Sequence, residues 1–198
     1  GLLALLRGRT RAAVALAATL LALDLTWQAV DGVHWRAQFL GMELAPFAVD
    51  KLSRLFSIIF SLMAFAGALF ALNQERRVEL PAAFLYAGAA SGVALAGDLV
   101  TVFVFWELMA VGSTLVIWSA ATPRAYGASM RYLMVHLFGG MLFLAGAAAH
   151  VLETGSAAFE PMQLDGVAQV LILAAFLMNA GAWPLSAWLP DAYPEASW

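Results

Sequence analysis

Long apolar stretches alternate with short polar ones along the whole chain. Each of six apolar stretches has the length that an α-helix needs to cross a bilayer, about 20 residues. These predicted spans are residues 12–30, 52–72, 80–97, 99–119, 128–152 and 166–189. Residues 31–50, between the first two spans, are expected to form a mixed loop. The pattern therefore predicts an all-α fold, a polytopic transmembrane bundle of about six helices, with residues 1–198 in a single membrane domain.

The sixth span contains a break in its helical pattern. It runs apolar as far as Met178 and then reads Asn179-Ala-Gly-Ala-Trp-Pro184. Pro184 has no backbone N–H to donate, and its ring clashes with the preceding helical turn. A membrane segment interrupted at mid-length is typical of the discontinuous helices of transporters. We therefore expect the last helix to be broken between Asn179 and Pro184.

The composition agrees with a membrane protein and excludes several classes of function. The chain is 63% hydrophobic and 12% charged, whereas a soluble domain carries about 25% charged residues. There is no basic patch of the kind that binds nucleic acid, so nucleic acid is not an expected partner. Cys is absent, which excludes disulfides and thiol nucleophiles. The sequence has no phosphate-binding Gly loop, nucleophile elbow or dinucleotide fingerprint, so we expect no cofactor and no catalytic site of its own.

The distribution of Lys and Arg predicts the orientation. If the six spans alternate, seven of the ten Lys and Arg residues fall on one side of the membrane and three on the other. The seven are Arg7, Arg9, Arg11, Arg76, Arg77, Arg124 and Arg131, and the three are Arg36, Lys51 and Arg54. Because Lys and Arg are enriched in cytoplasmic loops, both ends are expected on the cytoplasmic side. The sequence starts at Gly1 and both of its ends look interrupted, so we expect a fragment of a longer chain.

One carboxylate lies near the middle of a predicted span. Glu107 is flanked by apolar residues on both sides within 99–119. A charge at that depth costs about 3 kcal/mol or more unless it is paired or hydrated. Two interpretations follow. Either Glu107 relays protons or ions, or a polar neighbour on another helix satisfies it and it only holds the bundle together. In both cases it is expected to face the bundle interior.

His136 and Asn179 are the polar residues best placed to join Glu107 in a pathway. His136 lies inside 128–152, and an imidazole gains and loses protons near neutral pH. Its alternative role is that of a packing histidine bonded to a helix carbonyl. Asn179, at the predicted break, is expected to bind water or a neighbouring helix, or else an exposed backbone carbonyl.

Three residues nearer the ends of the spans are accessory candidates: Arg131, His150 and Asp98. Arg131 is most simply a boundary charge whose long side chain extends to the cytoplasmic surface. His150 is most simply an interfacial residue, and Asp98 ends the turn that leads into 99–119. No His or carboxylate pair has the spacing of a metal site, so no metal is expected.

Two motifs resemble those of a known family. They are Phe105-Trp-Glu-Leu-Met109 and Trp183-Pro-Leu-Ser-Ala-Trp-Leu-Pro-Asp-Ala-Tyr-Pro-Glu195. They resemble the proton-conducting antiporter-like membrane subunits of respiratory complex I, of Mrp-type cation/proton antiporters and of membrane-bound hydrogenases. With the segment from Arg131 to Gly140, the chain looks like the D-type members of the Mrp and hydrogenase branch. The resemblance implies a longer subunit with inverted helix repeats, of which this chain is part of the N-terminal half.

The resemblance also implies roles for single residues. Glu107 matches the family's proton-pathway glutamate, which in many members faces a lysine on the broken helix. Here Asn179 stands at the matching position, and Ser186 stands where many members have His. No Lys or Arg follows Arg131. Another helix therefore supplies the cation, or His136 takes its role, or this half conducts poorly.

The sequence as a whole predicts a transporter or translocase subunit. It would be a multi-pass protein of an inner or cytoplasmic, energy-transducing membrane, moving protons through Glu107, His136, Asn179 and water. The parent complex would be a cation/proton antiporter or a redox-driven pump. Expected partners are the other membrane subunits of a hetero-oligomeric complex, the lipid bilayer and protons, with Na+ left open. The alternative is a structural or anchoring subunit with a degenerate pathway, in which Glu107 is only a packing group.

Overall fold

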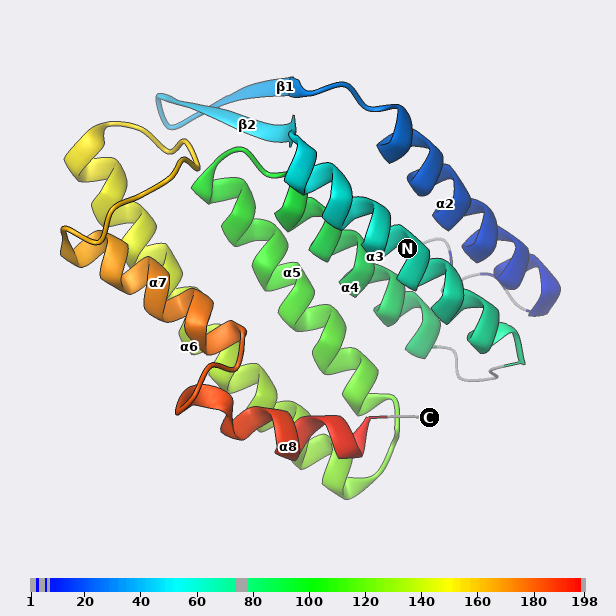
Figure 1. Cartoon of the computed structure of the whole chain (residues 1–198). Helices are drawn as coiled ribbons and strands as arrows, with labels where there is room; N and C mark the ends of the chain where they lie inside the picture. Colours follow the sequence, from blue (N-terminus) through cyan, green and yellow to red (C-terminus); the bar gives the residue numbers. More distant parts are fainter. Residues whose placement is uncertain (1–2, 4–5, 7, 74–77, 197–198) are drawn as a thin grey trace.

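The computed structural model describes residues 3, 6, 8–73 and 78–196 (Figure 1). Arg7, Arg76 and Arg77, on which part of the predicted orientation rests, lie outside these residues. The helices are α2 Gly8–Gln28, α3 Lys51–Phe70, α4 Glu79–Leu95, α5 Leu99–Trp118, α6 Pro123–Thr154, α7 Val167–Asn179 and α8 Trp188–Ala192. The other elements are the strands β1 Gly32–Phe39 and β2 Met42–Val49 and three 3-10 turns, Ala71–Asn73, Leu185–Ala187 and Tyr193–Glu195.

An α-helix occupies each predicted span, and the predicted helical bundle is confirmed. Within the described residues, α3, α5, α6 and most of α2 are long and apolar enough to cross a membrane, whereas α4 and α7 are shorter. The largest shift in a boundary is at α6, which begins at Pro123 and not at 128. Thr122 caps this helix, because its hydroxyl accepts a 3.0 Å hydrogen bond from the Ala125 N–H. Pro123 suits the first turn, where no N–H is needed.

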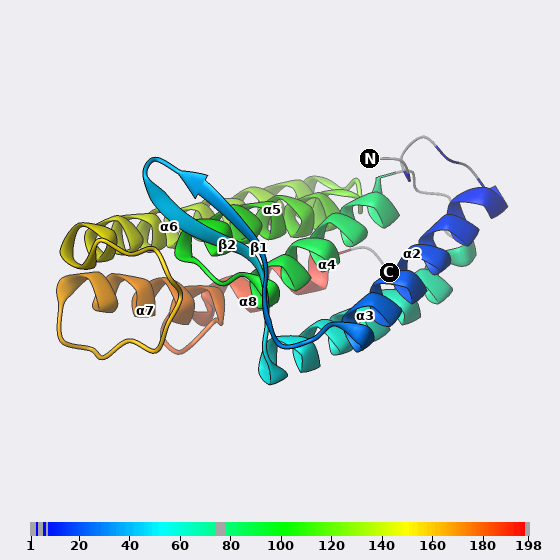
Figure 2. The same cartoon turned by 90° about the horizontal axis from the view of Figure 1, so that it is seen from above.

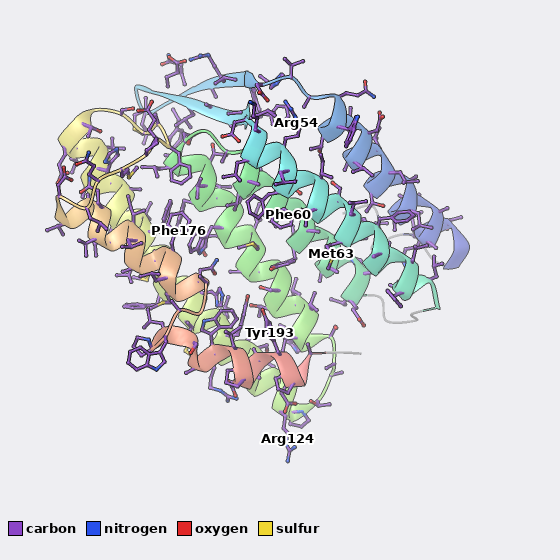
Figure 3. All side chains as sticks on the ribbon, viewed as in Figure 1. Arg54, Phe60, Met63, Arg124, Phe176 and Tyr193 are labelled. Carbon is purple, nitrogen blue, oxygen red and sulfur yellow. The ribbon has the colours of Figure 1, made fainter. Side chains whose placement is uncertain are left out.

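From α2 to α7, helices that are consecutive in the sequence lie side by side in the bundle (Figures 1 and 2). α5 packs against α4 on one side and α6 on the other, and α7 packs against α6. The main apolar core lies where α5, α6 and α7 meet: Leu99, Val102, Trp106, Phe143, Ala147, Ile172 and Ala175. Phe176 of α7 points toward α5 (Figure 3), and its ring meets the Trp106 ring edge-on at 5.1 Å. This packing fixes the helix that carries Glu107 against the two that carry His136 and Asn179.

Residues 31–50 form a β-hairpin, so the predicted loop is wrong. β1 pairs with β2 antiparallel, from Gly32 opposite Val49 to Phe39 opposite Met42. A two-residue turn joins the strands, with φ of 49° at Leu40 and 80° at Gly41. Two consecutive residues with positive φ give the turn the twist that a tight hairpin requires. The hairpin crosses the ends of the helices at one end of the bundle (Figure 1).

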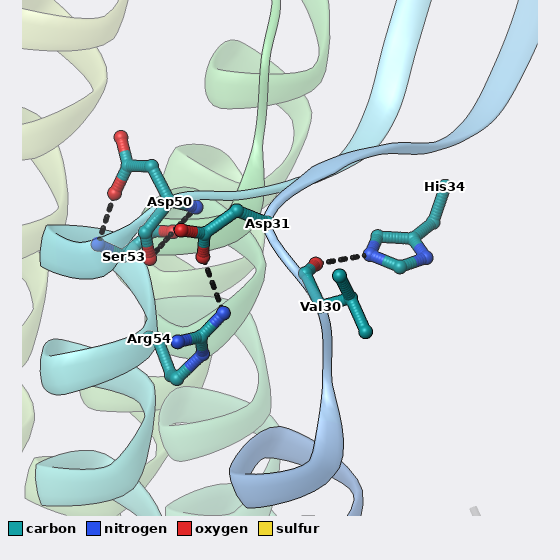
Figure 4. A network of polar contacts seen from close by, with 6 residues as sticks. All are labelled: Val30, Asp31, His34, Asp50, Ser53 and Arg54. Carbon is teal, nitrogen blue, oxygen red and sulfur yellow. Dashed lines mark hydrogen bonds and ion pairs between the residues drawn. The ribbon is translucent and has the colours of Figure 1, made fainter.

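A polar network ties the start of α3 to the segment before β1 (Figure 4). Asp50 caps α3, since its carboxylate accepts a 2.7 Å hydrogen bond from the Ser53 N–H while the Ser53 hydroxyl accepts one from the Asp50 N–H at 2.8 Å. The bond from the Ser53 N–H holds the pKa of Asp50 below its ordinary value. One turn further on, Arg54 pairs with Asp31. These contacts fix the end of α3 that adjoins the hairpin.

The predicted break in the sixth span is confirmed. α7 ends at Asn179, and Gly181 follows with a φ of 63°, a left-handed conformation that favours Gly. The Trp183–Pro184 peptide is cis. A 3-10 turn over Leu185–Ala187 leads into α8, which runs in a different direction from α7 (Figure 1). The chain after Asn179 therefore turns away from the axis of α7, and α8 packs against α6 and the end of α5.

Candidate functional site

Glu107 lies near the middle of α5 and its carboxylate faces α6. The residue is half-buried, and its Oε1 atom is buried with no hydrogen-bond partner among the described residues. Oε1 occupies the place next to Gly140 of α6, where a Cβ on that residue would overlap it. Gly140 therefore lets a carboxylate from α5 approach the backbone of α6 directly. The predicted inward orientation of Glu107 agrees with this contact.

His136 lies on the same face of α6, one turn before Gly140. The two residues are four apart, about 6 Å along the helix axis. His136 is only 4% exposed, and its Nδ1 lies 3.0 Å from the Tyr132 carbonyl oxygen. A carbonyl only accepts hydrogen bonds, so Nδ1 carries the proton, and Nε2 of the neutral ring is left as an acceptor. The available nitrogen is therefore Nε2.

Two aromatic rings enclose the imidazole. The Tyr132 ring stacks on it, with centroids 3.9 Å apart and an interplanar angle of 22°. Trp188 of α8 meets it edge-on at 4.7 Å and 81°. Both rings come from positions that the sequence analysis did not select. The contact of Tyr132 with His136 could have been predicted, because residues four apart lie on one face of a helix. The contact of Trp188 could not, because it depends on the turn after Asn179.

Asn179 lies beside His136 at the end of α7. The two residues line one small space together with Trp106, Gly139 and Met178. That space is too narrow to hold a water molecule in this conformation. The Trp106 Nε1 atom is buried and has no hydrogen-bond partner within the described part of the chain. The structure therefore brings His136 and Asn179 together, and Glu107 of α5 faces the adjacent turn of α6 at Gly140.

Arg131 lies one turn further toward the start of α6, and it pairs with Asp191 of α8. The guanidinium donates two hydrogen bonds, from Nε to Oδ2 at 2.8 Å and from Nη2 to Oδ1 at 2.7 Å. The side chains are 59% and 37% exposed, so the pair lies at the surface. The bond from Arg131 holds the pKa of Asp191 below its ordinary value. Sequence reasoning missed Asp191, because nothing in the spacing of residues 60 apart indicates such a pair.

Asp98 and His150 lie away from these groups. Asp98 is 1% exposed and caps α5, accepting from the Thr101 N–H and hydroxyl, each at 2.7 Å. Its Oδ2 also accepts from the Ala45 N–H at 2.9 Å, which ties the hairpin to α5. His150 is half-buried near the other end of α6, where Nδ1 lies 3.4 Å from the Gln169 amide. Both accessory candidates are thus at the hairpin end of the bundle, several turns from Glu107 and His136.

A buried carboxylate, an imidazole and a helix break near one another define a class of protein. The class is that of polytopic helical membrane proteins with a discontinuous helix beside ionisable groups inside the bundle. A family model described as "NADH:quinone oxidoreductase/Mrp antiporter, TM" matches residues 96–198, just over half of the chain. The chain belongs to this family. The matched region contains Glu107, His136, Asn179 and the broken helix.

Individual relatives agree with this assignment. The chain is 33% identical over 177 residues to the D subunit of a probable K(+)/H(+) antiporter of Rhizobium meliloti. This alignment covers 80% of this chain and 33% of that protein. It is 28% identical over 173 residues to the D subunit of a Na(+)/H(+) antiporter of Alkalihalophilus pseudofirmus, covering 78% of this chain and 35% of the relative. A chain of respiratory complex I from Thermus thermophilus superposes with a TM-score of 0.76 at 29% identity, covering 93% of this chain and 41% of that one. The chain spans about a third of the length of these curated relatives.

Proposed function

We propose that this chain is part of a membrane subunit of a multi-subunit, proton-translocating complex, and that protons move through Glu107, His136 and Asn179 with water between them. The observation that carries the proposal is the carboxylate of Glu107. Its Oε1 is buried against Gly140 with no hydrogen-bond partner in the described residues. An unpaired carboxylate at this depth is costly when charged, and such groups mark proton or ion pathways in membrane proteins.

The chemistry of the three residues fits a relay. A carboxylate takes up and releases a proton at one oxygen, and the unbonded Oε1 of Glu107 is available for that exchange. His136 accepts a proton at Nε2 while Nδ1 stays bonded to Tyr132. Asn179 carries no proton itself, but its amide offers a donor and an acceptor to a water at the helix break. Water must enter the narrow space at His136 for the three to connect.

The relatives support the coarser part of the proposal. Two of them are D subunits of antiporters, one for Na(+)/H(+) and one for K(+)/H(+), and a third belongs to respiratory complex I. We therefore propose a cation/proton antiporter or a redox-driven pump as the parent complex, in an inner or cytoplasmic, energy-transducing membrane. The partners would be other membrane subunits, lipid and protons, with Na+ or K+ as the exchanged cation in an antiporter. Both ends of this chain would lie on the cytoplasmic side.

A structural or anchoring subunit is the second candidate, and one observation favours it. His136 bonds to a backbone carbonyl and packs between two rings, beside a space too narrow for a water molecule. A packing histidine has this environment. In that case Glu107 would be a packing group, and the pathway would be degenerate at the Asn179 position.

Transport measurements separate the two candidates. Proton-coupled transport by the assembled complex in membrane vesicles would be compared for wild type, Glu107→Gln, His136→Ala and the double variant. A relay predicts that each single change removes most of the transport and that the double change adds little, because the residues act as one unit. Matched controls are Glu153→Gln and His34→Ala, whose side chains are exposed. If Glu107→Gln assembles normally and transports like the wild type, the relay is refuted and the structural role remains.

A further inference from the structure

A short helix lies directly over His136. α8 has only the five residues Trp188–Ala192, and its first residue places its ring against the imidazole. Trp188 is 9% exposed, and its Nε1 donates a 3.1 Å hydrogen bond to the Met178 carbonyl. That carbonyl belongs to the last turn of α7, next to the break. Trp188 therefore connects the two sides of the broken helix across the buried histidine.

α8 is too short to hold its position by its own backbone hydrogen bonds. A helix of one to two turns is unstable without tertiary contacts. Besides the Trp188 contacts with Met178 and His136, α8 is held by a small apolar cluster of Ile117, Tyr132, Trp188 and Ala192 and by the two hydrogen bonds from Arg131 to Asp191. The ion pair is the charged directional contact of α8 with α6, since a two-pronged guanidinium–carboxylate pair fixes orientation as well as distance. Asp191 lies three residues after Trp188, so fixing one side chain fixes the other.

This arrangement keeps water from the histidine. Tyr132 covers one face of the imidazole and Trp188 meets it edge-on, and His136 is 4% exposed. The space that His136 shares with Asn179 and Met178 admits no water. Two walls of that space, Asn179 and Met178, lie at the end of α7, where Trp188 is bonded. Movement of Trp188 would release the Met178 carbonyl and uncover one edge of the imidazole.

We propose that Trp188 is a gate over His136 and that the Arg131–Asp191 ion pair positions this gate, so that exchange of protons between water and His136 requires the pair to loosen. The gate rests on the proposed function of His136 as a proton carrier. Trp188, Arg131 and Asp191 are positioning residues in this scheme, because none of them has to carry the proton. The carrier remains His136.

The test measures water access to His136 separately from transport. Exchange of the imidazole Cε1 hydrogen in D2O, followed by mass spectrometry on peptides of the full-length protein in its complex, reports each histidine by itself. In the wild type, His136 is expected to exchange more slowly than the exposed His34. Asp191→Asn should raise the His136 rate by up to about fivefold, the change that loss of one partly exposed ion pair produces in an opening equilibrium. Trp188→Ala should raise it at least as much.

Two further variants make the test decisive. The charge swap Arg131→Asp with Asp191→Arg should bring the His136 rate back toward wild type, because it rebuilds the pair. Glu43→Gln, which removes the exposed Arg36–Glu43 pair on the hairpin, should leave the rate unchanged. The gate is refuted if Asp191→Asn leaves the His136 rate unchanged, or if it accelerates His34 and His150 equally, which indicates general loosening. A faster His136 rate together with wild-type transport in His136→Ala would support the gate and refute the proposed relay.

Discussion

The Oε1 atom of Glu107 fills the position that a side chain on Gly140 would occupy. A carboxylate on one transmembrane helix thus touches the backbone of the next, at the only kind of residue that leaves room for it. Glycine is usual at close helix contacts in membranes, where backbones approach each other. Here the Glu107 carboxylate occupies the space that Gly140 leaves. Substitution of Gly140 therefore tests the position of the carboxylate, as substitution of Glu107 tests the carboxylate itself.

Gly140→Ala is expected to displace Glu107 and impair transport. The added methyl group would overlap Oε1, and inserting a methyl group into a packed site costs about 1–3 kcal/mol. Gly139→Ala is the matched control, because the nearest atom to its Cβ would be the Met178 sulfur at an ordinary 3.5 Å. Melting temperature and vesicle transport should both fall in Gly140→Ala. The melting temperature should stay near wild type in Gly139→Ala, which is a control for stability only, because Gly139 lines the space beside His136. Equal effects of the two changes would mean that Glu107 does not depend on Gly140.

A second change tests the same contact by rescue. In a Glu107→Ala background the carboxylate is gone, so Gly140→Ala should no longer cost stability. The stability of the double variant should then match that of Glu107→Ala, so the two changes should be strongly non-additive, as expected for residues in contact. An undiminished loss in the double variant would place the clash elsewhere on α5.

The Arg131–Asp191 pair is expected to make stability depend on pH at acid values. Its bond to Arg131 lowers the pKa of Asp191 from 3.8, so its contribution is present above that value and is lost as pH falls through the lowered pKa. Asp191→Asn should therefore melt lower than wild type at neutral pH, and the difference should shrink as the pH falls below 3.8 and disappear below the lowered pKa of Asp191. A difference that persists undiminished at acid pH would mean that charge is not the cause.

The sequence predicted the helices because their signal is local. Runs of apolar residues long enough to span a bilayer specify helices regardless of what they pack against, and Pro184 marks the break by the N–H that it lacks. The hairpin was missed for the opposite reason. Leu40-Gly41 is not one of the usual hairpin turn pairs, and the register of the strands is irregular between Val33 and Ala37. These features obscure the alternation of the strands.

The sequence singles out the candidate site residues but not their contacts. Glu107, His136 and Asn179 stand out as polar groups inside apolar spans. Which helix faces meet is a property of the packed bundle, so neither the contact of Glu107 with Gly140 nor that of Trp188 with His136 follows from spacing. For Asp98 the structure shows a structural role that the sequence did not predict. It looked like a turn residue of accessory interest, and the structure gives it three hydrogen bonds that tie two elements together.

The orientation remains a prediction, and Cys labelling tests it well. The chain has no Cys, so single introduced Cys residues are read without background. Arg36 on the hairpin and Arg124 at the start of α6 are both exposed. A membrane-impermeant reagent added outside should label Arg36→Cys and spare Arg124→Cys, because the larger group of Lys and Arg is expected in the cytoplasm. Labelling of position 124 alone would reverse the orientation.

Loss of the Asp98 carboxylate is expected to cost more stability than loss of Asp50, although both residues cap helices. Asp50 is exposed and its cap is a local one, so Asp50→Ala should cost about 0.5–2 kcal/mol. Asp98→Ala removes a cap at a residue that is 1% exposed and also leaves the Ala45 N–H unpaired. An unpaired buried group adds about 1–3 kcal/mol, so Asp98→Ala should lower the melting temperature further.

Amide hydrogen exchange in the hairpin tests this last prediction independently of the melting temperature. Because the Asp98 carboxylate accepts from the Ala45 N–H, Asp98→Ala should make the hairpin open more often, and amide exchange should rise over β2 while it stays slow in the middle of α5. Asp98→Asn keeps one side-chain oxygen as an acceptor and should fall between wild type and Ala. Asp50→Ala should leave exchange in β2 near wild type. Unchanged exchange over β2 in Asp98→Ala would mean that the hairpin is held by its other contacts, and that Asp98 serves α5 alone.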